Sequence, residues 1–385
     1  MGKNIALVGC GKMGFPLAHY CITLGDIDEI TLEDIDPLQM DILENKIKKI
    51  HKNVVVYKGI TSKKFDFIVL ALSGKDTKVF ILDFINSNNF KKNQIVISLG
   101  RPNYDNEADH DEFNKHIKKW GLSLLYGFGL EPGLVEVIVK RTIKKYDSEK
   151  ISEINAFCGG IPKRAKAPLF YTLLFGDKLP SANRRALYKR DNQVMHCSRF
   201  DRHESIFIER IGLLEAYHDG MSPYFVNSPE VSSIPNFSQQ TVRWPGFAQS
   251  LRILHKCGLL SETLIPGYQV TASDTTHAVL KQNNLINDNV PDLTVLHVSL
   301  HFSDNAHNQS DYSISLISHY DEVLELSGMA KLTAFLPAFL IKYLGKSNIF
   351  LSDGITLSHE IFNSKEADDL IAMLKIRGIC DIFES

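Results

Sequence analysis

Three glycines near the N-terminus have the spacing of a loop that binds phosphate. The segment Gly9-Cys10-Gly11-Lys12-Met13-Gly14 follows the apolar run Ile5–Val8 and precedes residues with helical spacing. In a strand, turn and helix of this kind, Gly9 permits a tight turn, Gly11 lets the backbone approach a pyrophosphate, and Gly14 allows close packing. The free N–H groups and the positive dipole end of the helix then bind the pyrophosphate. We therefore expect residues 9–14 to hold a dinucleotide, with Lys12 either neutralising its phosphates or pointing to water.

Asp34 has the position of the acidic residue that binds ribose in such sites. It lies 20 residues beyond Gly14, and a carboxylate there accepts hydrogen bonds from the ribose hydroxyls. The alternative is that Asp34 caps the next helix, but Asp36 followed by Pro37 suits that role better. Because a carboxylate repels a 2′-phosphate and no basic residue follows, the sequence predicts NAD, with NADP as the alternative.

The segment Thr241–Phe247 carries a candidate anchor for a substrate carboxylate. Pro245 is expected to begin a helix that ends at Gly258. The apolar face of this helix would be formed by Phe247, Leu251 and Leu254. Arg243 would then stand just before a helix N-terminus, where it can bind a carboxylate through two hydrogen bonds, with Trp244 as an apolar wall. The alternative role for Arg243 is a salt bridge between domains.

Two further segments combine polar side chains with glycine. Cys158-Gly159-Gly160-Ile161-Pro162 allows a close approach of backbone to a ligand or to a neighbouring strand, or forms a tight turn with a small buried thiol. Leu214–Gly220 gathers four polar side chains, among them His218, either as a reactive cluster or as a surface loop. His110 has no matching ligand pair, so we predict no metal site.

Two basic groups, Lys163–Lys166 and Arg184–Arg190, are more typical of solvated surfaces than of phosphate sites.

Short apolar runs supply the strands that would position the N-terminal site. Four of them follow Asp34 and bring the expected number to about six: Val54–Tyr57, Phe67–Ala71, Ile95–Ser98 and Leu122–Leu125. Continuous apolar runs separated by crossover helices are typical of a doubly wound parallel sheet, the Rossmann fold. Ligands bind such sheets beyond the carboxyl ends of the strands, so the cofactor is expected to contact Leu72, Ser73, Gly74, Ser98 and Gly100. Ordinary turn chemistry is the alternative role for these residues.

The sequence changes character after residue 127. Leu130-Glu131-Pro132-Gly133 opens a helix, and the alternating segments Thr294–Phe302 and Tyr312–Ile317 are typical of an antiparallel sheet with one covered face. Helical spacing returns at Met329–Ala338. We therefore predict a Rossmann domain at 1–127, an α+β domain that binds substrate and dimerises at 128–328, and a C-terminal helical segment at 329–385 that packs back on the Rossmann domain.

Composition is that of an ordinary soluble protein. The 385 residues are 44 % hydrophobic and 23 % charged, with a net charge of -2 that suggests neither nucleic acid nor a membrane as partner. Six cysteines without paired spacing, and an N-terminus that leads at once into a strand, suit a reducing cytoplasm. The longest apolar run, Leu332–Leu344, is too short to span a bilayer.

Six segments in order resemble the saccharopine dehydrogenase family, most closely its branch of lysine 6-dehydrogenase and saccharopine reductase. They comprise the glycine-rich loop, Gly129–Leu134, Cys158–Pro162, Leu214–Gly220, Thr241–Gly246 and Met329–Thr333. The resemblance implies a Rossmann domain completed by the C-terminal segment and a central domain that carries the substrate and commonly forms a homodimer. It also implies that Glu131 meets the substrate amine, and that Cys158 and Arg243 line the substrate pocket. The chain departs from the family pattern between Lys166 and Phe200, in Glu131 where Asp is more usual, and at Lys331-Leu332-Thr333.

We therefore expect an NAD(P)-dependent oxidoreductase that acts on a CH–NH or CH–NH2 bond of lysine or a lysine-derived compound. Arg243 would hold the carboxylate, Glu131 would bind or deprotonate the amine, and Tyr104 and His218 are further candidates for proton transfer. The alternatives are an enzyme like carboxyspermidine dehydrogenase or homospermidine synthase, and a regulatory protein that binds the cofactor without catalysis.

Overall fold

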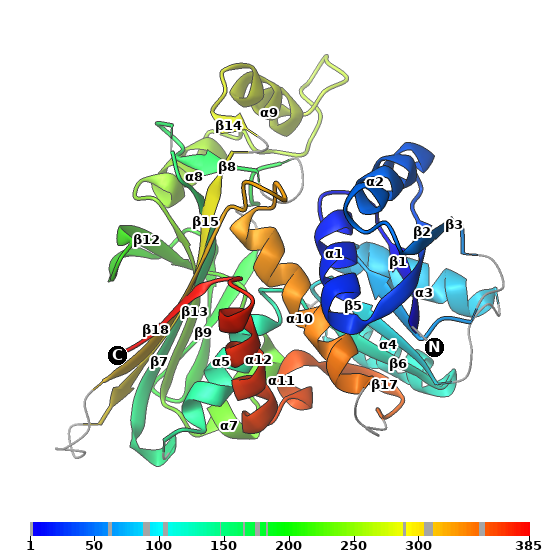
Figure 1. Ribbon diagram of the computed structural model, residues 1–385. Coiled ribbons are helices and arrows are strands. Elements are labelled where there is room, and N and C mark those ends of the chain that lie inside the picture. Colours follow the sequence, from blue (N-terminus) through cyan, green and yellow to red (C-terminus); the bar gives the residue numbers. More distant parts are fainter. Residues whose placement is uncertain are drawn as a thin grey trace. The chain divides into compact units, whose positions relative to one another are not determined.

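The chain folds into two compact units. The computed structural model describes residues 3–60, 64–87, 93–102, 107–146, 148–164, 166–173, 178–181, 184–287, 290–303, 311–345 and 351–385. We call the first body unit 1, comprising Met1–Arg141 and Ala330–Arg377, and the second unit 2, comprising Thr142–Met329 and Gly378–Ser385. In Figure 1 unit 1 runs from blue to cyan and returns in orange and red.

Unit 1 contains the expected parallel sheet. Within the described residues it has seven strands in the order β17-β6-β5-β4-β1-β2-β3, all of them parallel. The strands are β1 (Lys3–Val8), β2 (Ile27–Glu33), β3 (Val55–Lys58), β4 (Phe67–Leu70), β5 (Gln94–Ser98), β6 (Leu122–Tyr126) and β17 (Gly354–Leu357). The central strand β4 is buried along its whole length, because helices cover both faces of a sheet of this kind. The doubly wound fold is confirmed, and β17 confirms that the C-terminal segment completes it.

Helices precede or follow the strands of unit 1. They are α1 (Gly14–Gly25), α2 (Pro37–Ile50), α3 (Gly74–Asn86), α4 (Glu107–Lys119) and α5 (Leu134–Ile143), followed late in the chain by α10 (Gly328–Leu344), α11 (Ser358–Ile361) and α12 (Ser364–Ile376). Asp36 caps α2, with its carboxylate accepting from the Leu38 N–H at 3.0 Å and Pro37 in the first turn. Pro37 and Asp36 therefore act as the sequence predicted. Helix α10 packs on α1 through an edge-on contact between Phe335 and Tyr20, whose ring centroids are 5.7 Å apart.

Unit 2 is built on a mixed sheet. Its described strands run in the order β10-β9-β13-β7-β15-β16-β18, and the hairpin of β11 and β12 joins through β13. Their bounds are β7 (Ile151–Pro162), β9 (Arg185–Arg190), β10 (Gln193–Ser198), β11 (His203–Ile208), β12 (Gly212–His218), β13 (Asn236–Arg243), β15 (Asp292–Phe302), β16 (Tyr312–His319) and β18 (Asp381–Glu384). The pairing of β7 with β13 is parallel, whereas the other pairs are antiparallel. The prediction of an antiparallel sheet is therefore wrong for this one pair of strands. A parallel pair needs a long connection, and the chain between β7 and β13 is long enough.

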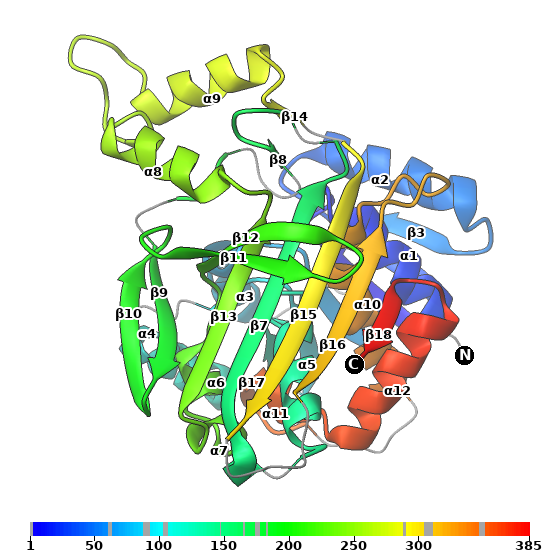
Figure 2. The same cartoon turned by 90° about the vertical axis from the view of Figure 1, so that its left-hand side faces the viewer.

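The hairpin covers one face of this sheet. Figure 2 shows β11 and β12 crossing in front of β13, β7 and β15. The apolar cluster beneath the hairpin contains Phe157, Ile161, Ile208, Leu214, Ala216, Val242 and Val295. The side chains of Leu214 and Ala216, which alternate along β12, thus point toward the sheet.

A cap of short elements packs against the other face of β12, the face that bears Tyr217. These are β8 (Tyr171–Thr172), β14 (Ile286–Asn287), α8 (Phe247–Lys256) and α9 (Ala272–Gln282), while α6 (Pro223–Val226) and α7 (Pro229–Ser232) lie in the connection before β13. The cap and sheet share a cluster that includes Tyr217, Phe247, Leu251, Phe200 and Leu179. The segment 166–200, which departs from the family pattern, therefore contributes to this cluster.

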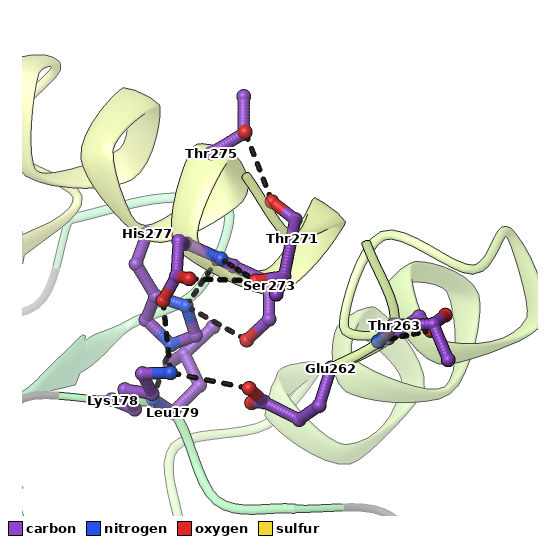
Figure 3. A network of polar contacts seen from close by, with 10 residues as sticks. Lys178, Leu179, Glu262, Thr263, Thr271, Ser273, Thr275 and His277 are labelled. Atoms are coloured by element: carbon purple, nitrogen blue, oxygen red, sulfur yellow. Dashed lines mark hydrogen bonds and ion pairs between the residues drawn. The ribbon is translucent and has the colours of Figure 1, made fainter. Parts of the chain in front are cut away.

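A polar network attaches the segment Lys178–Leu179 to α9 (Figure 3). His277 is buried, and its Nε2 accepts a hydrogen bond from the Leu179 N–H at 2.6 Å, so its proton is on Nδ1, 2.7 Å from the Ser273 carbonyl oxygen. Lys178 pairs with Glu262 and Asp274, all on the surface.

We predict that His277→Ala destabilises the protein and that Lys178→Ala has little effect. The first change leaves the buried Leu179 N–H without an acceptor, which costs about 1–3 kcal/mol, whereas exposed ion pairs contribute little. Urea denaturation of both variants measures the difference. Equal losses would contradict the importance of the buried histidine.

The unit boundaries differ from those predicted. Helix α5 lies mostly in unit 1, since the division falls at Arg141 rather than residue 127. The last eight residues join unit 2, because Gly378, with φ of 61°, ends the helical segment and β18 pairs with β16. The prediction of a helical segment at 329–385 is therefore wrong for β17 and β18, and packing on the Rossmann domain is wrong for 378–385. No described helix is both long and apolar enough to cross a membrane.

Candidate functional site

The glycine-rich loop of unit 1 has the geometry that its spacing predicted. Gly9 has φ of 91°, and a Cβ there would lie 2.8 Å from the carbonyl oxygen of Ala71. A Cβ on Gly14 would lie 2.8 Å from a methyl group of Leu43 and 3.3 Å from the Gly9 carbonyl oxygen. A Cβ on Gly11 would meet no atom within 4 Å. Packing therefore requires Gly9 and Gly14, whereas at Gly11 there is open space beside the backbone, which suits a pyrophosphate.

Asp34 lies directly after β2 and contacts this loop. One of its carboxylate oxygens accepts from the Cys10 N–H at 2.6 Å, and the other accepts from the Asp36 N–H at 2.9 Å. Asp34 is therefore not the cap of α2. It fixes the loop and presents a negative charge beside it. Burial and the charge of Asp34 raise the pKa of the Cys10 thiol to about 12, so this cysteine stays protonated. Lys12 is exposed, and Met13 is the residue that precedes the first turn of α1.

The residues expected at the carboxyl ends of β4 and β5 have local structural roles. Ser73 is the N-cap of α3 and exchanges hydrogen bonds with Asp76, next to the half-buried Leu72. Ser98 is fully buried, contacts the Thr77 hydroxyl at 2.9 Å, and accepts from the Gly100 N–H at 3.0 Å. A Cβ on Gly100 would lie 3.0 Å from the Cα of Gly74. Turn chemistry and close packing account for these residues, and contact with a cofactor stays a prediction.

Glu131 lies in the loop between β6 and α5. Its side chain is half-buried. Because β1 and β6 are parallel strands of one sheet, Glu131 follows the same carboxyl edge as the glycine-rich loop. Three strand spacings separate β6 from β1, or about 14 Å. Tyr104, the other proton-transfer candidate of this half, lies outside the described residues.

In unit 2 the guanidinium of Arg243 is buried and has no ion-pair partner among the described residues. Arg243 ends β13 and is 8 % exposed. Its Nη1 donates to the Val242 carbonyl oxygen at 2.8 Å, while its buried Nε has no partner. The guanidinium carbon lies 5.4 Å from the ring centre of Tyr171 and 5.8 Å from that of Phe247. A buried charge that is left unpaired argues against a structural salt bridge and for an anionic ligand.

The guanidinium stays charged in these surroundings. Burial acts to lower the pKa of Arg243, but Tyr217, Tyr171 and Asp219 favour the charged form, so its pKa is raised. Burial also raises the pKa of Tyr217, which keeps its phenol neutral. The site therefore offers a positive charge beside neutral aromatic groups.

Cys158 and Gly159 lie within β7, beside Arg243. Strand β7 pairs with β13, and Cys158 is opposite Thr241. A Cβ on Gly159 would lie 2.3 Å from the Val242 carbonyl oxygen and 2.6 Å from Nη1 of Arg243. Gly159 is therefore needed for the close approach of the neighbouring strand and of Arg243, as the first alternative predicted. The second alternative, a tight turn, is wrong, because these residues lie within β7. Cys158 itself is buried.

Trp244 does not form the predicted wall. Its indole N–H donates to the Pro162 carbonyl oxygen at 2.9 Å, and its ring packs on the apolar cluster beneath the hairpin. Trp244 follows the last residue of β13, and these contacts place its ring on the face opposite to Arg243. The aromatic rings beside the Arg243 guanidinium are those of Tyr171 and Phe247 instead of Trp244.

His218 is likewise on the face opposite to Arg243. It follows Tyr217 in β12, stacks on Tyr188 with ring centroids 4.6 Å apart, and lines a polar cavity of about 380 Å³ together with Glu204 and Gln240. Burial lowers its pKa. Since the sheet separates His218 from Arg243, the expectation that both serve one site is wrong.

Four residues lie near Arg243: Tyr171, Tyr217, Arg199 and Asp219. Sequence reasoning gave no role to Tyr171 and Arg199, and it counted Tyr217 and Asp219 in a possible reactive cluster without placing them beside Arg243. The prediction that the basic group Arg184–Arg190 is solvated is wrong for two of its members: Arg184 pairs with Asp219, and Lys189 is buried. Alternation along Leu214–Asp219 was a signal for Tyr217 and Asp219, because in a strand Glu215, Tyr217 and Asp219 share one face. No local sequence pattern indicated Tyr171 or Arg199, since the residues that they contact are distant from them in the sequence. No three potential metal ligands gather in the described part of the chain.

The parallel sheet, its glycine-rich loop and Asp34 define unit 1 as a dinucleotide-binding fold of the Rossmann type. Residues 129–379 match the family model described as saccharopine dehydrogenase C-terminal domain. The chain belongs to this family, as its motifs predicted.

Individual proteins resemble the chain more distantly. The mitochondrial alpha-aminoadipic semialdehyde synthase of Rattus norvegicus is 23 % identical over 290 residues, covering 71 % of this chain; the chain spans 30 % of the length of that relative. Apo saccharopine dehydrogenase (L-Glu forming) from Saccharomyces cerevisiae has a TM-score of 0.76 at 16 % identity, with 100 % of this chain and 99 % of that chain covered. Homospermidine synthase from Legionella pneumophila, solved in complex with NAD, has a TM-score of 0.64 at 10 % identity, with 100 % and 91 % covered. These structures have the same fold as the chain.

Proposed function

We propose that this protein is an NAD-dependent oxidoreductase that acts on a carbon–nitrogen bond of lysine or of an imine adduct derived from lysine. The observation that carries the proposal is the buried guanidinium of Arg243, which has no ion-pair partner among the described residues and suits the carboxylate of an amino acid. Membership of the saccharopine dehydrogenase family supports the reaction class.

The residues of unit 1 fit a dinucleotide. Gly11 leaves open space beside the backbone, α1 begins directly after this loop with the positive end of its dipole, and Asp34 offers a carboxylate to ribose hydroxyls. A bound nicotinamide cofactor supplies the hydride acceptor or donor. The homospermidine synthase with this fold was solved with NAD, which supports the choice of cofactor.

The protein's own side chains would bind the substrate and move its proton. Arg243 would hold the carboxylate and thereby orient the carbon–nitrogen bond. A lysine-type amine has a pKa of about 10.4 and must be neutral before it loses hydride, so the oxidative direction needs a base, a role that we assign to Glu131. A homodimer and a cytoplasmic location stay predictions.

A panel of amines and oxo-acids with NADH and NAD, followed by absorbance of the reduced cofactor, tests this function. We expect cofactor turnover with lysine alone, or with lysine and an oxo-acid, and much weaker turnover with lysinamide. The fold shared with homospermidine synthase favours a second candidate, an enzyme that borrows a hydride and returns it. Product formed without net change in NADH would support that candidate instead.

Cofactor choice is expected to favour NAD over NADP. The Asp34 carboxylate lies beside the loop, and neither Ile35 nor Asp36 offers a positive charge to a 2′-phosphate. Calorimetry with NADH and NADPH measures the preference, and Asp34→Ala should reduce it. Tighter binding of NADPH would contradict the ribose role of Asp34 and make Lys12 the leading candidate for a phosphate contact.

A further inference from the structure

Two carboxylates share a sheet face with Arg243, yet neither pairs with it. Glu215, Tyr217 and Asp219 alternate along β12 and its end, and Glu215 lies directly opposite Arg243 in the pairing of β12 with β13. Side chains at directly opposite positions have Cβ atoms about 4.5–5.5 Å apart. Asp219 contacts the Thr241 hydroxyl at 3.4 Å, and Thr241 is two residues before Arg243, or roughly 7 Å along the strand. Both acids are thus near enough to neutralise Arg243 after a side-chain rotation.

Glu215 is held by the N-terminus of α8. Its two oxygens accept from the Gly246 N–H at 2.7 Å and the Ala248 N–H at 2.6 Å, and its side chain is buried. A carboxylate at a helix N-terminus satisfies N–H groups that lack a partner within the helix and also interacts with the helix dipole. Both oxygens of Glu215 are therefore engaged away from Arg243.

Asp219 is held by arginines. Arg199, 8 % exposed, donates from Nη2 to one oxygen of Asp219 at 2.5 Å, and Arg184 lies 3.2 Å from the other oxygen. Arg199 is itself fixed by a hydrogen bond from Nη1 to the Ser181 carbonyl oxygen at 3.1 Å. The Gly220 N–H also donates to Asp219, at 2.9 Å. Of the partners of Asp219, Arg199 is the buried cation, and a buried ion pair of this kind is strongly favoured over a lone buried charge.

We propose that Arg199 is a positioning residue that keeps Arg243 available to an anionic ligand by engaging Asp219, which would otherwise neutralise it. The proposal rests on the anion-binding role of Arg243 within the proposed function. It also gives a role to the segment 166–200, because both arginines that contact Asp219 come from this segment, where the chain departs from the family pattern. The N-terminus of α8 engages the carboxylate of Glu215, as Arg199 engages the carboxylate of Asp219.

The test uses glutarate, a carboxylate without an amine, as the probe. Its dissociation constant is measured by NMR titration on the NAD-loaded protein, so that no turnover is needed. Arg199→Leu releases the Asp219 oxygen that Arg199 engages, while Arg184 still contacts the other oxygen. The released oxygen can then pair with Arg243, which should weaken glutarate binding about tenfold, the loss of one charge-assisted hydrogen bond. Adding Asp219→Asn to Arg199→Leu should restore most of the affinity, because no carboxylate then competes. A purely structural role of Arg199 would give no such rescue.

Two further variants keep the proposal testable if Arg199→Leu does not fold. Asp219→Asn alone should retain the wild-type affinity for glutarate, and a tenfold loss there would overturn the proposal. Arg202→Leu is the matched control, since Arg202 is exposed and stacks on Tyr188, away from Arg243; it should leave binding unchanged. Unchanged binding in Arg243→Ala would overturn the anion role of Arg243 itself, whereas loss there without loss in Arg199→Leu would overturn the role of Arg199 only.

Discussion

Replacing Gly11 with valine should weaken dinucleotide binding severely while leaving unit 1 folded. A Cβ at this position meets no protein atom within 4 Å, so the fold has room for the new side chain. The same space is where a pyrophosphate must approach the backbone, and a steric conflict of about 1–3 kcal/mol lowers affinity roughly fivefold to more than a hundredfold. Calorimetry with NADH and circular dichroism measure the two properties separately.

Gly9→Val is the matched control for this experiment. At Gly9 φ is 91°, and a Cβ would lie 2.8 Å from the Ala71 carbonyl oxygen, so the larger residue should destabilise the fold itself. The two variants therefore lose binding for different reasons, which thermal unfolding distinguishes. A Gly11→Val protein with wild-type affinity for NADH would show that the cofactor does not bind at this loop.

Arg243→Ala should lower kcat/KM for a carboxylate substrate by at least about tenfold, since a charge-assisted hydrogen bond contributes roughly 1.5–3 kcal/mol. Arg243→Lys keeps the charge but loses the planar pair of donors and should have an intermediate effect. The affinity for NADH should change little in both variants. Steady-state kinetics, with calorimetry for the cofactor, measures these effects.

An amidated substrate is the control for the Arg243 prediction. Lysinamide should react poorly with the wild-type protein and lose little more in Arg243→Ala, because the interaction is already missing. If Arg243 served only to stabilise unit 2, the Ala variant would lower the melting temperature and weaken acid and amide substrates equally. That result would remove the carboxylate-anchor role.

The parts of the fold that depend on residues close together in the sequence could be predicted. The glycine-rich loop, the Asp36 cap and the strands β4, β5 and β6 are set by local spacing and by continuous apolar runs. The parallel pairing of β7 with β13 and the late strand β18 could not, since pairing partners are distant in sequence and four residues carry too short a pattern.

The candidate site could be predicted only in part for the same reason. Arg243 was recognisable from its place before a helix, but its surroundings come from Tyr171, Phe247 and the far side of β12. His218 was assigned to the wrong face because Leu214–Gly220 was treated as a possible loop, and Trp244 because it is adjacent to Arg243 in the sequence. Alternation along β12 places His218 on the face opposite to Arg243, and the ring of Trp244, just after the end of β13, packs on that same opposite face.

The C-terminal segment supplies a strand to both sheets, β17 at the edge of the unit 1 sheet and β18 at the end of the unit 2 path. During synthesis the chain emerges from its N-terminus onward, so the edge of β6 waits for β17 at Gly354–Leu357, and the edge of β16 waits for β18 at Asp381–Glu384. Neither sheet can complete its hydrogen bonding co-translationally from its own contiguous stretch. Truncation before Gly354 would therefore expose two aggregation-prone edges at once. A fragment that ends at Arg141 would lack β17, and a fragment that ends at Met329 would lack both β17 and β18.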